Sequence, residues 1–206
     1  MRHQPQLPDA CAVDVGAYAC HRAGVTGRGV RIGLSDCGIG ARDYFAARSY
    51  RIEGSRTRHD GHGTGMAAVL LSLAPDATIV SRPAGATALS ELLRTAGVDL
   101  ILCSWGVRTG PETMDFSSGP PVIAADAGLP GVWPAMAPSV TAVADVRGRP
   151  SGPYSLPGGH HRWSGASVVA ASCCGIAALA LSAGHEARPA VRLAASFDLA
   201  PIVNER

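Results

Sequence analysis

The 206-residue chain contains no lysine, and all eighteen of its basic residues are arginines. Sixteen acidic residues nearly balance them and leave a formal net charge of +2. A charge so close to balance gives no electrostatic reason to expect a nucleic acid or an anionic membrane as the partner. The substrate class has to be sought in a local site instead.

Two further features are missing. The six cysteines form no Cys-x-x-Cys pair, so neither a zinc cluster nor a thioredoxin-like motif is expected. Cys103, Cys173 and Cys174 stand in apolar runs, where cysteine usually behaves as a small buried apolar residue. The first residues lack the apolar stretch of a signal peptide, and no run of about 20 apolar residues could span a membrane. We therefore expect a cytoplasmic protein.

The apolar residues that are present follow an alternating order of strands and helices. Apolar runs with β-branched residues predict buried strands at 29–35, 77–80, 98–103, 121–125 and 140–146. Runs with helical spacing predict helices at 65–73, 88–95 and 168–182. This order predicts an α/β fold with a doubly wound, mostly parallel β-sheet and helices on both faces. Residues 105–120 are barely enough for a parallel crossover that contains a helix.

The chain is long enough for one substantial core and short for two. We expect a single domain over residues 1–206, in which 1–22 form an N-terminal extension and 184–206 a C-terminal tail that packs on the domain.

Polar residues at the ends of predicted elements are the candidates for chemistry. Ligands of a doubly wound sheet bind beyond the carboxyl ends of its strands, where Asp36, Ser104 and Asp126 lie. His62 and Ser167 each precede a long apolar helical run. The N-terminus of a helix has free N–H groups and favours negative charge, so it can hold an oxyanion.

These residue types fit nucleophilic catalysis. A serine hydroxyl needs a neighbouring imidazole to accept its proton, and a carboxylate fixes the imidazole tautomer. Taken singly, Asp36 is also typical of a strand-end cap, His62 of a turn and Ser167 of an ordinary helix cap.

Three separated segments resemble the signature motifs of the subtilisin-like serine proteases (the subtilases), in the order Asp, His, Ser. Asp36-Cys-Gly-Ile39 resembles the family's Asp-Thr-Gly-Ile, and His62-Gly-Thr-Gly65 resembles His-Gly-Thr-His. Gly165-Ala-Ser167 is similar to Gly-Thr-Ser, and the resemblance spans residues 23–183. It implies a subtilisin-like fold and a triad of Ser167 as nucleophile, His62 as base and Asp36 as the orienting carboxylate, with no cofactor.

One departure from the family concerns the asparagine whose amide completes the oxyanion hole. The only asparagine here is Asn204. An ungapped match of 123–129 to the family's strand end places Leu129 at that position, and a small gap places Asp126 there. Leucine donates no hydrogen bond, and aspartate donates one only when protonated. Loss of such a donor lowers turnover by about 10²–10³-fold, so we expect slow catalysis.

Ser104-Trp105-Gly106 resembles the segment that pairs with extended substrate in the family. Trp105 either narrows a pocket there or only packs. We expect hydrolysis of a peptide bond through an acyl-enzyme, on a restricted peptide or protein substrate such as a precursor peptide. Transfer of the acyl group to an amine instead of water would use the same residues.

Two alternatives are open. A catalytically impaired pseudo-subtilase would bind a peptide or serve as a partner or scaffold subunit, and the missing asparagine favours it. The short spacings between the motifs indicate trimmed loops, which a partner subunit or a second copy could complete. A metal site is the other alternative, because His59, Asp60 and His62 are close in sequence and His160 and His161 are adjacent. Zinc needs three or four convergent ligands, and the triad accounts better for His62, so no metal is expected.

Overall fold

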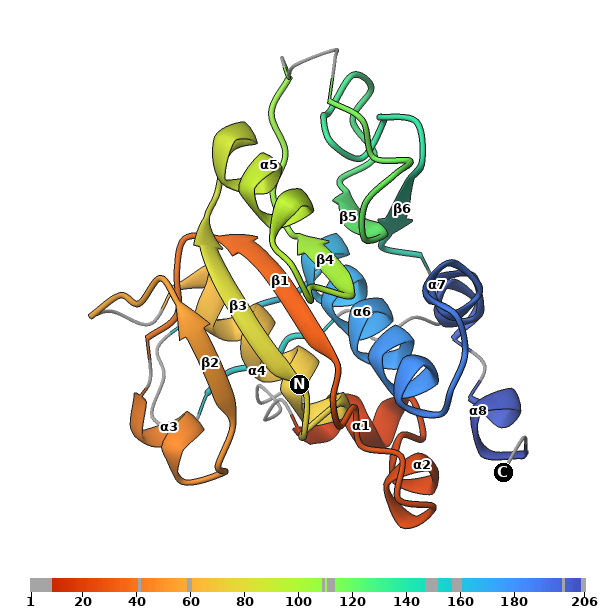
Figure 1. Cartoon of the computed structure of the whole chain (residues 1–206). Helices are drawn as coiled ribbons and strands as arrows, with labels where there is room; N and C mark the ends of the chain where they lie inside the picture. Colours follow the sequence, from red (N-terminus) through yellow and green to blue (C-terminus); the bar gives the residue numbers. More distant parts are fainter. Residues whose placement is uncertain are drawn as a thin grey trace.

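The computed structural model describes residues 9–40, 42–58, 61–108, 110, 114–146, 152–156, 161–197 and 199–204. Its centre is a parallel six-stranded sheet in the order β2-β3-β1-β4-β5-β6 (Figure 1). The strands are β1 (Arg31–Asp36), β2 (Arg51–Gly54), β3 (Thr78–Pro83), β4 (Leu100–Cys103), β5 (Val122–Asp126) and β6 (Val140–Ala144). The five predicted strands are confirmed. The edge strand β2 was missed because it is short and mostly exposed, so it has no apolar run.

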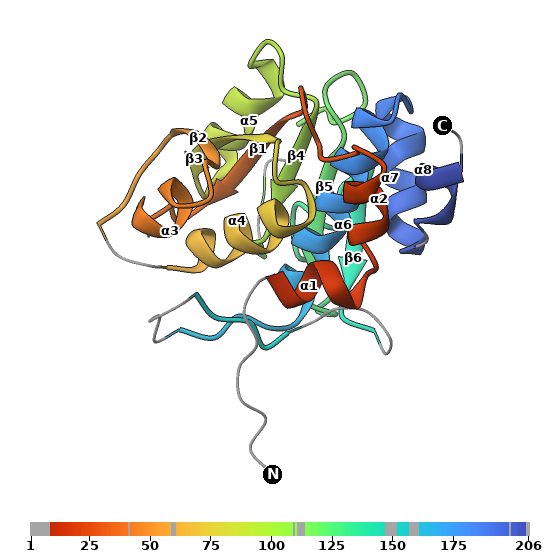
Figure 2. The ribbon, with the colours of Figure 1, turned by 90° about the horizontal axis from the view of Figure 1, so that it is seen from below.

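Helices cover both faces of this sheet, as predicted. They are α1 (Asp9–Asp14), α2 (Tyr18–Arg22), α3 (Arg42–Ala46), α4 (His62–Leu73), α5 (Ala86–Arg94), α6 (Ala166–Ser182), α7 (Ala187–Ser196) and α8 (Ala200–Asn204). Figure 2 shows α5 on one side of the sheet and α4 and α6 on the other. Two apolar cores result, and the larger one lies on the side of α4 and α6.

The central strand β1 carries Asp36 to its carboxyl end, and its last five residues are buried. Ile32 and Leu34 belong to the larger core. Gly33 faces the other side, where an added Cβ would lie 3.0 Å from Cδ2 of Leu92 on α5. The strand β1 lies between two layers of helices and pairs with β3 and β4. Asp36 therefore has a fixed position at the carboxyl end of the strands.

The connection between β4 and β5 contains no helix among its described residues, although the two strands are parallel. Its length is barely enough for a crossover that contains a helix. The chain instead forms the loops above β5 and β6 in Figure 1.

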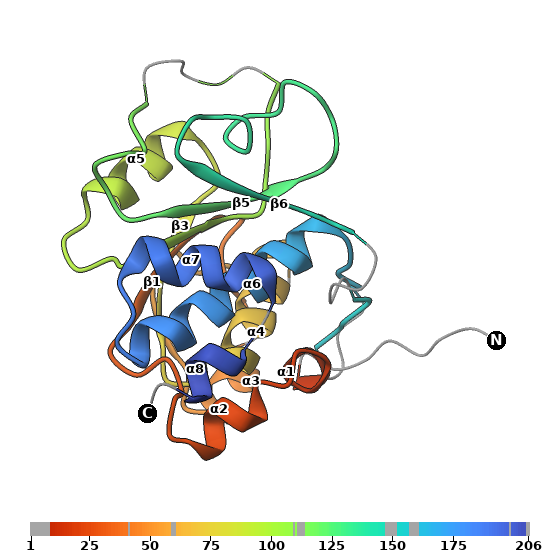
Figure 3. The same cartoon turned by 90° about the vertical axis from the view of Figure 1, so that its right-hand side faces the viewer.

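Both ends of the described chain pack on the α4 and α6 side. Helix α1 buries Cys11 and Ala12, and Cys11 Sγ lies 3.1 Å from Ser172 Oγ of α6. Residues 9–22, expected as an extension, thus contribute to the core. Helix α7 lies beside α6 (Figure 3), and α8 contacts α2. Within the described residues, no helix is both long and apolar enough to cross a membrane.

Candidate active site

Asp36 and His62 form a hydrogen-bonded pair where β1 ends and α4 begins. Nδ1 of His62 lies 2.9 Å from Oδ2 and 3.1 Å from Oδ1 of Asp36. The Asp36 side chain is 5% exposed, whereas that of His62 is 41% exposed. A proton on Nδ1 satisfies this contact and leaves Nε2 as the acceptor nitrogen, which hydrogen-bonds to no described residue.

Small residues let α4 approach the end of β1 this closely. A Cβ on Gly63 would lie 2.6 Å from the carbonyl oxygen of Gly38 and 3.1 Å from Cβ of Asp36. The buried Thr64 hydroxyl accepts the N–H of Gly40 at 2.8 Å. The loop after β1 and the first turn of α4 are therefore tied together around the Asp36–His62 pair.

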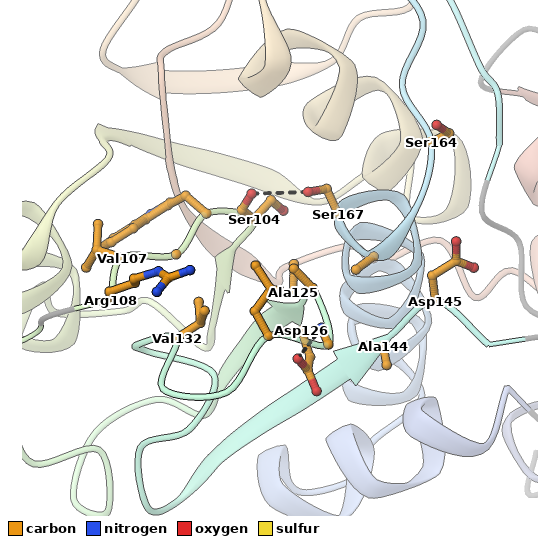
Figure 4. A pocket seen from close by; sticks show the side chains of 16 residues that line it. Ser104, Val107, Arg108, Ala125, Asp126, Val132, Ala144, Asp145, Ser164 and Ser167 are labelled. Carbon is orange, nitrogen blue, oxygen red and sulfur yellow. Dashed lines mark hydrogen bonds between the residues drawn. The ribbon is translucent and has the colours of Figure 1, made fainter.

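Ser167 lies in the first turn of α6, as the sequence predicts. The N–H groups of Val168 and Val169 bond to the Gly165 carbonyl, whereas no described residue accepts the N–H of Ser167. Its hydroxyl donates to the Ser104 carbonyl oxygen at 3.2 Å (Figure 4). The structure gives it no hydrogen bond to His62. The structure thus joins Asp36 to His62 directly and Ser167 to Ser104.

A cavity of about 660 Å³ opens beside Ser167. Six of the residues singled out in the sequence line it: Ser104, Trp105, Gly106, Asp126, Leu129 and Ser167. Asp36 and His62 are not among its lining residues.

Arg108 and Asp145 also line the cavity and were not predicted. Asp145 directly follows β6, so the rule that found Asp36 would have found it as well. The strand was predicted to extend to residue 146, two residues beyond its observed end, so Asp145 was not recognised as following a strand. Arg108 lies in a loop, and no sequence signal pointed to it.

Asp126 and Leu129 lie on the cavity wall, and neither brings an amide to it. Oδ1 of Asp126 accepts the N–H of Gly128 at 2.8 Å, which directs this carboxylate oxygen toward its own turn. Leu129 is 55% exposed. Which of them occupies the position of the family's asparagine stays a prediction.

Trp105 both lines the cavity and packs. Its Nε1–H donates to Ser35 Oγ at 3.0 Å, and its ring centroid lies 5.7 Å from that of Trp133. Ser35 Oγ in turn donates to the Pro83 carbonyl at 3.2 Å. These bonds link the ends of β4, β1 and β3. Gly106 has no room for a side chain, because a Cβ there would overlap Val132.

The candidate metal ligands stay apart as far as they are described. Among the described residues, no three His, Cys, Asp or Glu side chains form a group that could hold a metal ion. His59, Asp60 and His160 lie outside those residues, and His161 is exposed.

The comparisons with known proteins found similarity in the fold and no match by sequence. No family model and no curated protein sequence matches it. The structure of the prenylagaramide maturation protease PagA matches with a TM-score of 0.65 and 21% identity, over 85% of this chain and 84% of PagA. The MycP3 protease from the type VII (ESX-3) secretion system matches with a TM-score of 0.63 and 17% identity, over 91% of this chain and 80% of MycP3.

The chain has the fold of subtilisin-like proteases. The subtilisin-like fold confirms the predicted α/β class with its parallel sheet. Because both identities are low, this likeness concerns the fold, and activity has to be argued from the site.

Proposed function

We propose that the protein is a serine peptidase in which Asp36, His62 and Ser167 act as a catalytic triad. The observation that carries the proposal is the hydrogen bond from His62 Nδ1 to the buried Asp36 carboxylate, which leaves Nε2 free to accept a proton. The contact between Trp163 and Gly65 supports it, because these residues lie close in sequence to Ser167 and His62.

Catalysis would begin with attack of Ser167 Oγ on the carbonyl carbon of the substrate, while its proton moves to His62 Nε2. Asp36 would stabilise the imidazolium. Collapse of the tetrahedral intermediate breaks the C–N bond, and His62 gives its proton to the leaving amine. Water then hydrolyses the acyl-enzyme with His62 as the base. An amine in place of water would give transfer instead.

In the free protein the Ser167 hydroxyl is turned toward the Ser104 carbonyl. Attack requires a rotation about χ1 of Ser167 that brings this hydroxyl within hydrogen-bond reach of His62 Nε2. Substrate would favour this rotation, because an extended peptide paired with 104–106 would offer its own N–H to that carbonyl.

The unused N–H of Ser167 at the start of the 17-residue α6 is the donor we assign to the oxyanion. Neither Leu129 nor Asp126 supplies the amide donor found in the family, since Leu129 has no polar group and an ionised carboxylate accepts hydrogen bonds without donating them. We therefore expect turnover about 10²–10³-fold below that of a complete site.

The substrate we propose is a peptide segment of restricted sequence, such as a precursor peptide. PagA is described as a maturation protease, which supports this choice by analogy only.

A pseudo-subtilase that binds a peptide or partner without turnover is the second candidate. The hydrogen bond of Ser167 to Ser104 and the missing amide favour it.

Labelling with a fluorophosphonate probe at neutral pH separates the two candidates. An active triad predicts labelling that Ser167→Ala abolishes and that Ser90→Ala, on the opposite side of the sheet in α5, leaves intact. Absence of labelling in the folded wild-type protein would exclude the peptidase.

A further inference from the structure

The cavity beside Ser167 is lined by more acidic than basic side chains, and the triad does not explain this excess. Two carboxyl side chains, Asp126 and Asp145, and one guanidinium, Arg108, line it. The formal charges of these three side chains therefore sum to one negative charge. Figure 4 shows Arg108 beside Val107 and Val132 on one side, with Asp126 at the end of β5 and Asp145 beyond the first turn of α6.

Asp126 has binding capacity that the described residues do not use. Its Oδ1 accepts the Gly128 N–H, while Oδ2 makes neither a hydrogen bond nor an ion pair with any described residue. Asp145 likewise forms no ion pair within the described part of the chain. A ligand that entered the cavity without a cation would strip water from Asp126 and leave its charge uncompensated.

A second, independent feature of this cavity is the Ser104 hydroxyl. Ser104 is only 5% exposed, it lines the cavity, and its Oγ has no hydrogen-bond partner among the residues that the structure describes. A buried hydroxyl without a partner destabilises a fold unless a ligand completes it. Oγ of Ser104 is shielded from solvent in the free protein, so an N–H group of such a ligand would reach it only after a small shift of this side chain.

The other lining residues form an apolar surface that can contact the aliphatic or planar part of a ligand's side chain. Val107, Leu129 and Val132 give apolar surface, and Ala125 and Gly128 leave room beside Asp126. Lysine and arginine side chains combine such a stem with a cationic end.

We propose that this cavity binds the side chain of the substrate residue that precedes the cleaved bond, and that this side chain is cationic. The position rests on the proposed function, because the carbonyl attacked by Ser167 belongs to that residue and its side chain must lie within a few bonds of Ser167. The preference for a cation rests on Asp126 and Asp145.

Binding of benzamidine tests the preference without any need for turnover. In the full-length Ser167→Ala protein, calorimetry should show saturable benzamidine binding at least about tenfold tighter than that of neutral benzamide. Asp126→Asn should weaken benzamidine by about tenfold or more. Asparagine keeps an oxygen for the Gly128 N–H, so this variant preserves the turn.

Two variants act as controls of opposite kind. Glu91→Gln removes the same charge from the surface of α5 and should leave the affinity within about twofold, because screening by salt is strong at that range. Arg108→Gln removes the cation from the cavity and should strengthen benzamidine binding by a few-fold.

Equal affinity for benzamidine and benzamide, or an Asp126→Asn effect no larger than that of Glu91→Gln, would overturn the proposal. Tighter binding of benzoate that Arg108→Gln abolishes would overturn it in favour of an acidic substrate. None of these outcomes depends on whether fluorophosphonate labels Ser167, so a failed triad and a failed cation pocket are told apart.

Discussion

Trp163 lies against Gly65 so closely that a Cβ at residue 65 would overlap its indole ring. Gly65 is one turn into α4 after His62, and Trp163 is four residues before Ser167. The same tryptophan is 5% exposed and pairs with Tyr154 through two backbone hydrogen bonds of 2.9 Å. The indole fills the space that a side chain at residue 65 would need, which accounts for the glycine at this position.

Gly65→Ala should therefore destabilise the protein. Alanine favours a helix by about 1 kcal/mol over glycine, but overlap with a buried indole costs about 1–3 kcal/mol, so we expect a net loss in the free energy of unfolding. Urea denaturation measures this. Trp163→Leu makes room for the methyl group, so the double variant should lose less than the sum of the single variants. Additive losses would contradict a direct contact.

Asp36→Asn should abolish most of the reactivity of Ser167. The amide can still contact His62 Nδ1, but it no longer holds the tautomer that leaves Nε2 as a base, and we expect labelling by fluorophosphonate to slow by about 10⁴-fold. Asp43→Asn removes an equal charge from an exposed position of α3 and serves as the control. If both variants label at the wild-type rate, Asp36 has no part in activating Ser167.

Leu129→Asn tests the missing oxyanion donor. Leu129 is 55% exposed on the cavity wall, so the change should be tolerated, and a new amide facing the oxyanion would raise kcat/KM by up to about 10²-fold. Hydrolysis of a p-nitrophenyl ester reports the rate. Leu129→Ala shortens the side chain without adding a donor and should give no such gain. Identical rates for the two variants would place the asparagine position elsewhere, with Asp126 as the remaining candidate.

The thiols should fall into two classes toward an alkylating reagent at pH 7.5. Cys37 is exposed, whereas the other five cysteines are buried. Burial raises the pKa of the Cys11 thiol to about 11 and raises the pKa of Cys103 and Cys174 as well, so their reactive thiolates are scarce at this pH. Mass spectrometry should find one fast adduct, which Cys37→Ser removes. Several equally fast adducts would contradict the packing of α1 and α6.

Much of the fold could be predicted from the sequence because its signals are local. Continuous apolar runs identify five of the six strands, and the apolar stretches after His62 and Ala166 identify α4 and α6. The elements that were missed lack such runs: β2 is exposed on three of its four residues, and α7 alternates buried alanines with exposed arginines. Their formation depends on the neighbours against which they pack.

The sequence by itself determined the order of the Asp36, His62 and Ser167 motifs and the kind of element at which each lies, since strand ends and helix starts follow from short-range patterns. Only the tertiary structure decided which side chains meet. It paired His62 with Asp36, turned the Ser167 hydroxyl to Ser104, placed Trp163 over Gly65 and brought Arg108 and Asp145 to one cavity with Asp126. These residues are far apart in the chain, and their contacts arise from the parallel crossovers that gather distant strand ends at one edge of the sheet.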